Sequence, residues 1–174
     1  MPRYLAAVLV TAAAACATLP PEGAAPLPAL SAVPSSFAVS GRIAIRQDQR
    51  SDIAKLRWTR EPGADVWVVS SPLGNEVARI ESDPRGATLT RAGEAPEHAA
   101  SFQSLTERIL GVALAPDDVA AWLHGGKPRA TAGWNVTIDE TQAAGKVTLA
   151  RRVTAQRGDV VVKLVIDDYK PLGD

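Results

Sequence analysis

Apolar and polar residues alternate over most of the chain after residue 36, which is the pattern of strands with one buried face. Phe37–Arg46 is the clearest case, because its odd positions are phenylalanine, valine, glycine and isoleucine, whereas serine and arginine lie on the other face. The alternation recurs in residues 53–60, 76–82, 87–91, 133–139, 146–155 and 159–169, and residues 66–69 are all β-branched or aromatic, as strands prefer. Short turns separate most of these segments, so the pattern predicts a meander of about eight antiparallel strands.

Between residues 101 and 125 the apolar positions change to a spacing of three and four, which is typical of amphipathic helices. Phe102, Leu105 and Ile109 mark a first helix, with Ser101 as its expected N-cap and Gly111 at its end. A second helix is expected from residue 116, where a proline and two aspartates favour a helix start. We expect both helices to cover the open apolar side of the sheet.

The segment DVWVVSSPLGNEVARI, residues 65–80, reads as a β-hairpin with a tight connection. Pro72 suits the second position of a turn and Gly74 can adopt a positive φ. Leu73 between them is unusual, because a turn tip faces water. Its side chain either folds back onto the sheet or points outward to meet something apolar. The hairpin alone favours a leucine with no special function, since single exposed leucines are common.

The N-terminus has the features of a secretory signal at residues 1–15. Arg3 precedes an apolar stretch that is too short to span a bilayer, and Ala13-Ala14-Ala15 precedes Cys16, the one cysteine of the chain. This arrangement resembles a bacterial lipoprotein signal, although such signals most often have leucine at the position of Ala13. The alternative is an ordinary secretory signal with an unrelated cysteine. Residues 16–36, rich in proline and alanine, are expected to be a lipid-anchored flexible tether before a domain at residues 37–170.

Composition and motifs favour a binding protein over an enzyme. The chain has 19 basic and 19 acidic residues, so no charge excess points to nucleic acid. His98 and His124 lack partners at metal-ligand spacing and are expected at the surface, and no G-x-S-x-G motif is present. We therefore expect no catalytic residue, no metal site and no cofactor.

The number of inward apolar faces is large enough for a curled sheet to enclose a cavity, but a filled core would give the same periodicity. Close packing favours the filled core at this point. If a cavity exists, its candidate lining residues are Ile43, Leu56, Trp58, Trp67, Val69, Leu110, Trp122, Trp134, Val136, Val162 and Leu164.

Several segments, taken in order, resemble the LolB family of outer-membrane lipoprotein receptors. They are the signal ending at Cys16, Phe37–Arg46, Trp58, Ser70–Ile80, Ala121–Leu123, Gly133–Val136 and Val161–Tyr169. The imperfect signal and the Gly-Gly-Lys after the second helix depart from the family pattern.

The resemblance implies a mainly β fold with short helices, an incomplete antiparallel β-barrel or half-barrel that encloses a hydrophobic cavity covered by α-helices. It further implies that the protein receives lipoproteins from the periplasmic carrier LolA, holds their acyl chains in the cavity and inserts them into the inner leaflet of the outer membrane.

On this reading Pro72, Leu73 and Gly74 form a transfer loop that meets phospholipid. Cys16 carries diacylglycerol and an N-acyl group, and the protein is a monomer that faces the periplasm from the outer membrane. The alternatives are a lipoprotein that carries another apolar ligand, or a tethered scaffold with a filled core.

Overall fold

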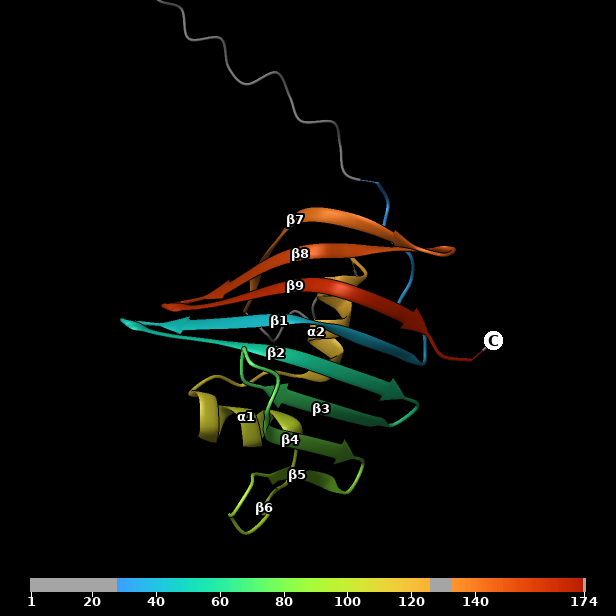
Figure 1. Ribbon diagram of the computed structural model, residues 1–174. Helices are drawn as coiled ribbons and strands as arrows, with labels where there is room; N and C mark the ends of the chain where they lie inside the picture. Colours follow the sequence, from blue (N-terminus) through green and yellow to red (C-terminus); the bar gives the residue numbers. More distant parts are fainter. Residues whose placement is uncertain (1–27, 126–132, 174) are drawn as a thin grey trace, which may run out of the picture.

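The computed structural model describes residues 28–125 and 133–173, and the side chains of Ile109 and Leu110 are not described. Nine strands and two short helices lie within these residues (Figure 1). Their bounds are β1 Phe37–Gln47, β2 Arg50–Glu61, β3 Ala64–Ser70, β4 Glu76–Asp83, β5 Gly86–Thr90, β6 Glu97–Ala99, α1 Phe102–Leu110, α2 Pro116–Leu123, β7 Asn135–Ala144, β8 Val147–Arg157 and β9 Val160–Pro171.

All described strands belong to one antiparallel sheet with the order β6-β5-β4-β3-β2-β1-β9-β8-β7. The sheet combines two meanders, β1 to β6 and β7 to β9, which join where β9 pairs with β1. The sheet is open, with β6 and β7 at its two edges. The prediction of an incomplete antiparallel barrel is confirmed, and the short edge strand β6 was not predicted.

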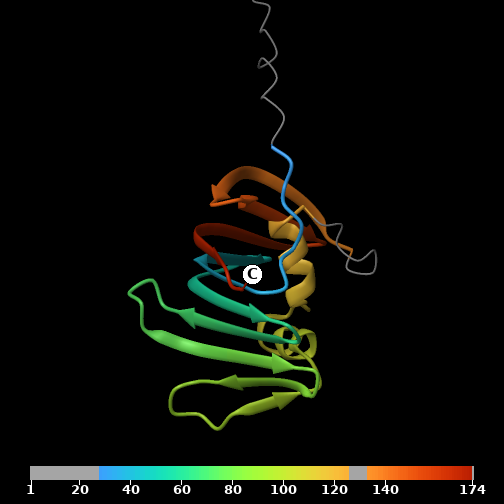
Figure 2. The ribbon, with the colours of Figure 1, turned by 90° about the vertical axis from the view of Figure 1, so that its right-hand side faces the viewer.

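Both helices lie on one side of the curved sheet, as expected (Figure 2). Helix α1 begins with a capping box in which Ser101 and Ser104 bond each other's backbone N–H groups, and it ends at Gly111 with φ of 69°. Helix α2 begins at Pro116 and ends at Leu123. None of the helices in residues 28–125 and 133–173 is long and apolar enough to cross a membrane.

The core lies between the sheet and the helices and contains a chain of aromatic rings. Phe37 contacts Trp58 with 4.8 Å between ring centroids, Trp58 contacts Trp67 at 5.2 Å, and Trp67 contacts Phe102 of α1 at 4.9 Å. Aromatic pairs at such distances add to the stabilisation from burial alone. This chain of rings ties the middle of the sheet to α1.

His124 is buried, so the prediction that it lies at the surface is wrong. The end of α2 packs against the sheet, and the His124 ring lies 5.9 Å from that of Phe37 and 5.5 Å from that of Tyr169. The Tyr169 hydroxyl and His124 Nε2 are 3.2 Å apart. Burial lowers the pKa of His124 and raises the pKa of Tyr169 to about 12, which favours the neutral form of both. His98 is exposed, as expected.

The described end of the expected tether, residues 28–36, runs against the domain. The backbone N–H of Ser31 donates to the carbonyl of Thr148 over 2.8 Å, and the N–H of Thr148 donates to Ser31 Oγ over 2.9 Å. Strand β8 pairs with β9 only from Arg152 to Arg157, so Ser31 occupies the side of β8 that β9 leaves open. Leu30 packs against the hydrophobic core in the same region.

Candidate functional site

An apolar cavity of about 160 Å³ lies between α1 and the inner face of the sheet. Strands β1 to β4 form its floor and Thr106 of α1 lies opposite them. The Thr106 hydroxyl is hydrogen-bonded to nearby backbone groups, since it donates to the Gln103 carbonyl and accepts from the N–H of Leu114. It therefore adds little polarity to the cavity wall. The lining residues are Ile43, Ile45, Asp52, Ala54, Trp67, Val69, Ala78, Ile80 and Thr106.

Three of the predicted cavity residues line this space, namely Ile43, Trp67 and Val69. Others are packed in the filled part of the interior, where Leu56, Trp58, Trp122, Val162 and Leu164 are each at most 4% exposed. Trp134 and Val136 are half-buried on β7 and the segment before it, and the side chain of Leu110 lies outside the described residues. The described interior is therefore mostly filled, with a hollow beneath α1.

The size of the hollow limits what it holds in this conformation. A dry cavity of about 150 Å³ accepts a molecule the size of benzene. A long acyl chain needs more space, so binding one requires α1 to move away from the strands that it covers. The aromatic contact between Trp67 and Phe102 is one contact that such a movement would change.

The hairpin between β3 and β4 presents Leu73 to solvent, with 90% of the residue exposed. Two hydrogen bonds of 2.8 Å close the turn, from Ser71 N–H to the Asn75 carbonyl and from Gly74 N–H to the Ser71 carbonyl. Gly74 has φ of 99°, a conformation that favours glycine. The turn therefore holds the Leu73 side chain outward. In Figure 2 this hairpin projects from the side of the sheet opposite the helices.

The exposed leucine and the cavity are joined by the same two strands. Val69 of β3 pairs with Ala78 of β4, and both side chains line the cavity. They are the last inward-facing residues before the turn that carries Leu73. The turn and the hollow thus lie at the same end of the sheet.

A polar network connects the two sides of the core and was not found from the sequence. Trp58 Nε1 donates to Asp65 Oδ1 over 2.7 Å, inside the protein. Arg60 lies 4.0 Å from the same carboxylate and bonds Asp117 at the start of α2. Burial raises the pKa of Asp65, an effect that the Trp58 hydrogen bond and the Arg60 charge oppose. The network fixes α2 to the β2–β3 hairpin.

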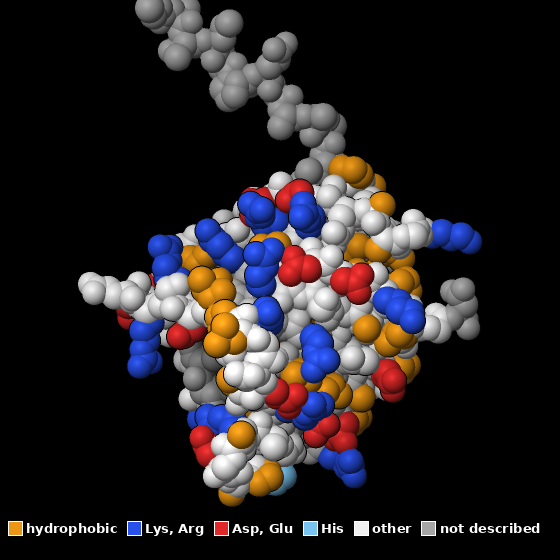
Figure 3. Space-filling view, in the orientation of Figure 1, with side chains coloured by type: hydrophobic (Ala, Val, Ile, Leu, Met, Phe, Trp, Pro, Cys, Tyr) orange, Lys and Arg blue, Asp and Glu red, His pale blue; other side chains and the backbone are white. Residues whose placement is uncertain are grey.

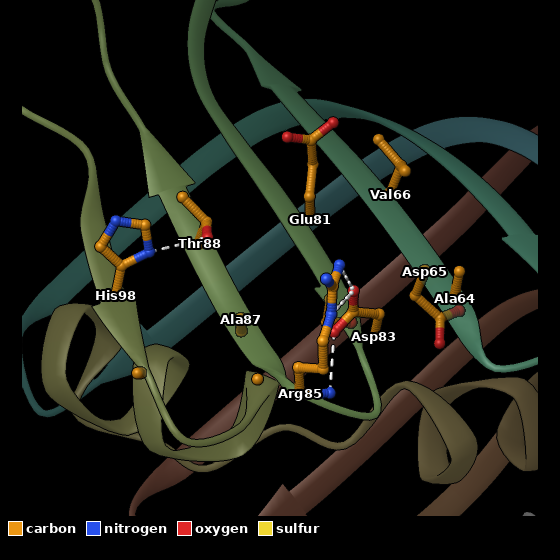
Figure 4. Close-up of a pocket in the computed structure, with 12 residues that line it drawn as sticks. Ala64, Asp65, Val66, Glu81, Asp83, Arg85, Ala87, Thr88 and His98 are labelled. Carbon is orange, nitrogen blue, oxygen red and sulfur yellow. Dashed lines mark hydrogen bonds and ion pairs between the residues drawn. The ribbon is translucent and has the colours of Figure 1, made fainter.

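A separate and larger hollow lies on the outer face near the β6 edge, and charged side chains stand among the residues that line it (Figure 4). Arg85 and Asp83 form an ion pair of 2.6 Å there, and Thr88 Oγ1 lies 3.0 Å from His98 Nδ1. Charged groups and open solvent make this hollow unsuitable for an acyl chain. Within the described residues, no group of three acidic, histidine or cysteine residues is placed to hold a metal ion.

The outer face of the sheet carries basic and acidic side chains with hydrophobic ones between them (Figure 3). Several of these charges are paired, as in Arg42 with Asp167, Arg79 with Glu76 and Arg151 with Glu140. The two faces of the sheet thus differ sharply, since the inner one is almost wholly apolar.

Comparison with known proteins identifies the family. The family model described as "Outer membrane lipoprotein LolB" matches residues 35–169, which include both helices and the whole sheet except the last two residues of β9. The chain belongs to the LolB family.

Relatives in this family match almost the whole chain. An outer-membrane lipoprotein LolB from Thiobacillus denitrificans is 30% identical over 97% of this chain and 98% of its own length. The LolB of Chromobacterium violaceum is 31% identical over 83% of this chain and 87% of its own. The protein is accordingly a non-enzymatic outer-membrane lipoprotein that handles other lipoproteins.

The fold is shared more widely than the sequence. A DUF1329 family protein from Desulfovibrio piger aligns with a TM-score of 0.56 at 7% identity, covering 81% of this chain and 88% of its own. A LolA superfamily protein from Nitrosomonas europaea aligns with a TM-score of 0.46 at 10% identity, covering 80% and 87%. Cys16 and the signal at residues 1–15 lie outside the described residues, so their roles stay predictions.

Proposed function

We propose that this protein receives lipoproteins from the periplasmic carrier LolA, shelters their acyl chains beneath α1 and inserts them into the inner leaflet of the outer membrane. The observation that supports this most directly is the placement of an apolar cavity at the base of the hairpin that exposes Leu73. Cys16, carrying diacylglycerol and an N-acyl chain, would hold the protein at that membrane. The transfer loop is Pro72, Leu73 and Gly74.

The physical requirement for such a receptor is continuous shielding of hydrocarbon. Each methylene group exposed to water costs about 0.8 kcal/mol, so an acyl chain must pass between apolar surroundings at every step. Without nucleotide hydrolysis, the sequence of carrier, receptor cavity and bilayer must run downhill in free energy. A cavity that is small when empty and enlarges as α1 moves would bind the chain loosely enough to release it.

Leu73 would act at the release step. Its side chain gains no burial in the folded protein, but it gains burial when the turn enters a bilayer. Ala78 and Val69, at the base of the same turn, would then place the cavity next to the lipid surface.

Transfer from purified LolA-type carrier into liposomes tests the proposal. The test protein is the mature chain with Leu73→Glu, compared with wild type and with Leu73→Met, which keeps an apolar tip. We expect Leu73→Glu to accept lipoprotein from the carrier but to deliver it about tenfold or more slowly, because a charged tip cannot enter hydrocarbon. Val33→Glu, at another exposed apolar residue, is the matched control and should not slow delivery.

Two results would refute this assignment of the loop: equal loss of uptake and delivery in Leu73→Glu, or loss of neither. A fluorescent acyl probe separately tests the cavity. Failure of the probe to bind would favour a tethered scaffold with a filled core, whereas probe binding without any transfer from the carrier would favour a lipoprotein that carries another apolar ligand.

A further inference from the structure

A second groove, of about 400 Å³, lies on the outer face of the sheet directly beside the Leu73 turn. It crosses β1 and β2 and reaches the end of β3 and Asp167 of β9, and Gly74 forms part of its wall. Its lining residues are Ser40, Gly41, Arg42, Lys55, Leu56, Arg57, Ser70, Gly74 and Asp167. The groove is thus continuous with the turn that carries the exposed leucine.

The groove carries an excess of positive charge. Arg42, Lys55 and Arg57 contribute three cationic groups, and Asp167 contributes one carboxylate, which pairs with Arg42 over 3.0 Å. Among the described residues, neither Lys55 nor Arg57 has a carboxylate within ion-pair distance, and both are exposed. Asp168 pairs with Ser40 and so lies two strands away from Arg57. Glu76 lies two strands away from Lys55, through Ser70, and forms an ion pair with Arg79.

The strand register places these cations in one patch. Arg42 is the cross-strand partner of Lys55, and Lys55 is the partner of Ser70, the last residue of β3 before the turn. Arg57 is two residues from Lys55 and therefore points to the same side of the sheet. Ile53, two residues from Lys55 in the other direction, is 62% exposed. Exposed apolar groups at Ile53 and Leu73 thus flank the cationic groove.

Apolar tips beside a cationic surface are the combination that binds an anionic membrane surface. Leu73 lies three residues beyond Ser70, so at most about 10 Å along the strand direction separates it from the level of Lys55. Apolar groups of surface-bound elements reach about 5–10 Å into the boundary between headgroups and acyl chains. When Leu73 is at that depth, the groove is at the level of the lipid phosphates.

We propose that the groove formed by Arg42, Lys55 and Arg57 binds the phosphates of anionic phospholipid headgroups while the Leu73 turn is in the membrane. This inference rests on the proposed function, because that function places the turn at the bilayer. It adds the lipid class that the outer face recognises and the residues that recognise it. The groove would orient the receptor so that the cavity at the base of the turn faces the leaflet.

Vesicle binding of the mature chain, residues 16–174 with Cys16→Ser to prevent lipid attachment, tests the inference. Vesicles are made of phosphatidylcholine alone or of phosphatidylcholine with phosphatidylglycerol. We expect phosphatidylglycerol to raise the affinity for vesicles. In the double variant Lys55→Gln with Arg57→Gln this increase in affinity should be about tenfold or more smaller, since each basic residue near an anionic surface contributes about fivefold. The loss should shrink at high salt, because salt screens exposed charges.

The matched control is Lys146→Gln with Lys170→Gln, which removes the same charge from two exposed positions outside the groove. An equal loss in this control would overturn the inference, because net charge alone would then explain the binding. Inorganic phosphate added at millimolar concentration should not compete with the vesicles. Competition would show a site for the free anion and would also overturn the inference.

The outcome remains separable from that of the proposed function. Leu73→Glu should weaken binding to both kinds of vesicle, whereas the groove variant should affect only the vesicles with phosphatidylglycerol. If the groove variant behaves like wild type while Leu73→Glu still blocks transfer, the groove inference fails alone. If transfer does not depend on Leu73 but the groove variant loses its selective binding, the proposed role of the turn fails alone.

Discussion

Trp58 donates a hydrogen bond to Asp65 across the β2–β3 hairpin, with 2.7 Å between the indole Nε1 and Oδ1. Both groups are buried, and Asp65 also lies 4.0 Å from Arg60. A carboxylate inside an otherwise apolar core costs free energy unless its partners compensate for lost hydration. Trp58 and Arg60 therefore stabilise the fold by offsetting this cost.

Replacing Asp65 tests this network. Asp65→Ala leaves the Trp58 N–H without an acceptor and should lower the free energy of unfolding by about 1–3 kcal/mol. Asp65→Asn keeps an acceptor oxygen, so at low pH it should lower the free energy of unfolding by less than Asp65→Ala does. Chemical denaturation of the three proteins measures both effects, and equal stability of Asp65→Ala and wild type would show that the hydrogen bond contributes nothing.

The Asp65→Asn variant also has a distinct pH dependence. The pKa of Asp65 is raised in the folded state above 3.8, so folding favours the protonated form. The stability that this preference contributes is present below 3.8 and is lost as the pH rises through the folded pKa. We expect wild type to lose stability relative to Asp65→Asn across that interval. A difference that stays constant with pH would contradict the prediction.

Gly41 allows β9 to approach β1 at a bulge. A Cβ at this position would lie 2.2 Å from the Val165 carbonyl oxygen and 3.1 Å from Ile166 Cα. Backbone atoms cannot move aside cheaply, so Gly41→Ala should lower the free energy of unfolding by about 1–3 kcal/mol. Ser40→Ala, at the neighbouring residue, should change it by less than about 0.5 kcal/mol. Thermal or urea unfolding measures both, and equal effects would show that the close approach is not the cause.

Filling the cavity should separate ligand binding from stability. Ala78→Leu extends a side chain into the hollow of about 160 Å³, so we expect the free energy of unfolding to be unchanged or raised by about 1 kcal/mol, and affinity for a fluorescent acyl probe to fall. Ala155 is fully buried in the packed core, so Ala155→Leu should instead destabilise the fold by about 1–3 kcal/mol. Unchanged probe affinity in Ala78→Leu would place the acyl site elsewhere.

The strands and helices were predictable because one face of each is buried, and burial imposes a period of two or of three to four. The pairing of β9 with β1 was not predictable from this period, since it joins segments far apart in the sequence through backbone hydrogen bonds. Strand β6 has three residues, too few to show a period. An open hairpin tip exposing Leu73 was among the readings of the sequence, but its contact with lipid remains a proposal.

Periodicity could identify inward-facing residues but not whether space remains between them. For that reason only Ile43, Trp67 and Val69 of the predicted cavity residues line the hollow, whereas large rings fill the rest. The burial of Asp65 could have been predicted from the sequence. Asp65 occupies an inward position in the same alternation as Trp67 and Val69. A carboxylate at such a position indicates a buried partner.

The bonding of Ser31 to β8 sets how far the domain can travel from its proposed anchor. Leu30 is fourteen positions after Cys16, and a fully stretched chain of that length spans about 50 Å at most. If residues 31–36 were not bound to the domain, the tether would be about 20 Å longer. By binding this stretch along the sheet, the protein shortens the greatest distance between the domain and its proposed anchor, which keeps the Leu73 tip closer to the bilayer.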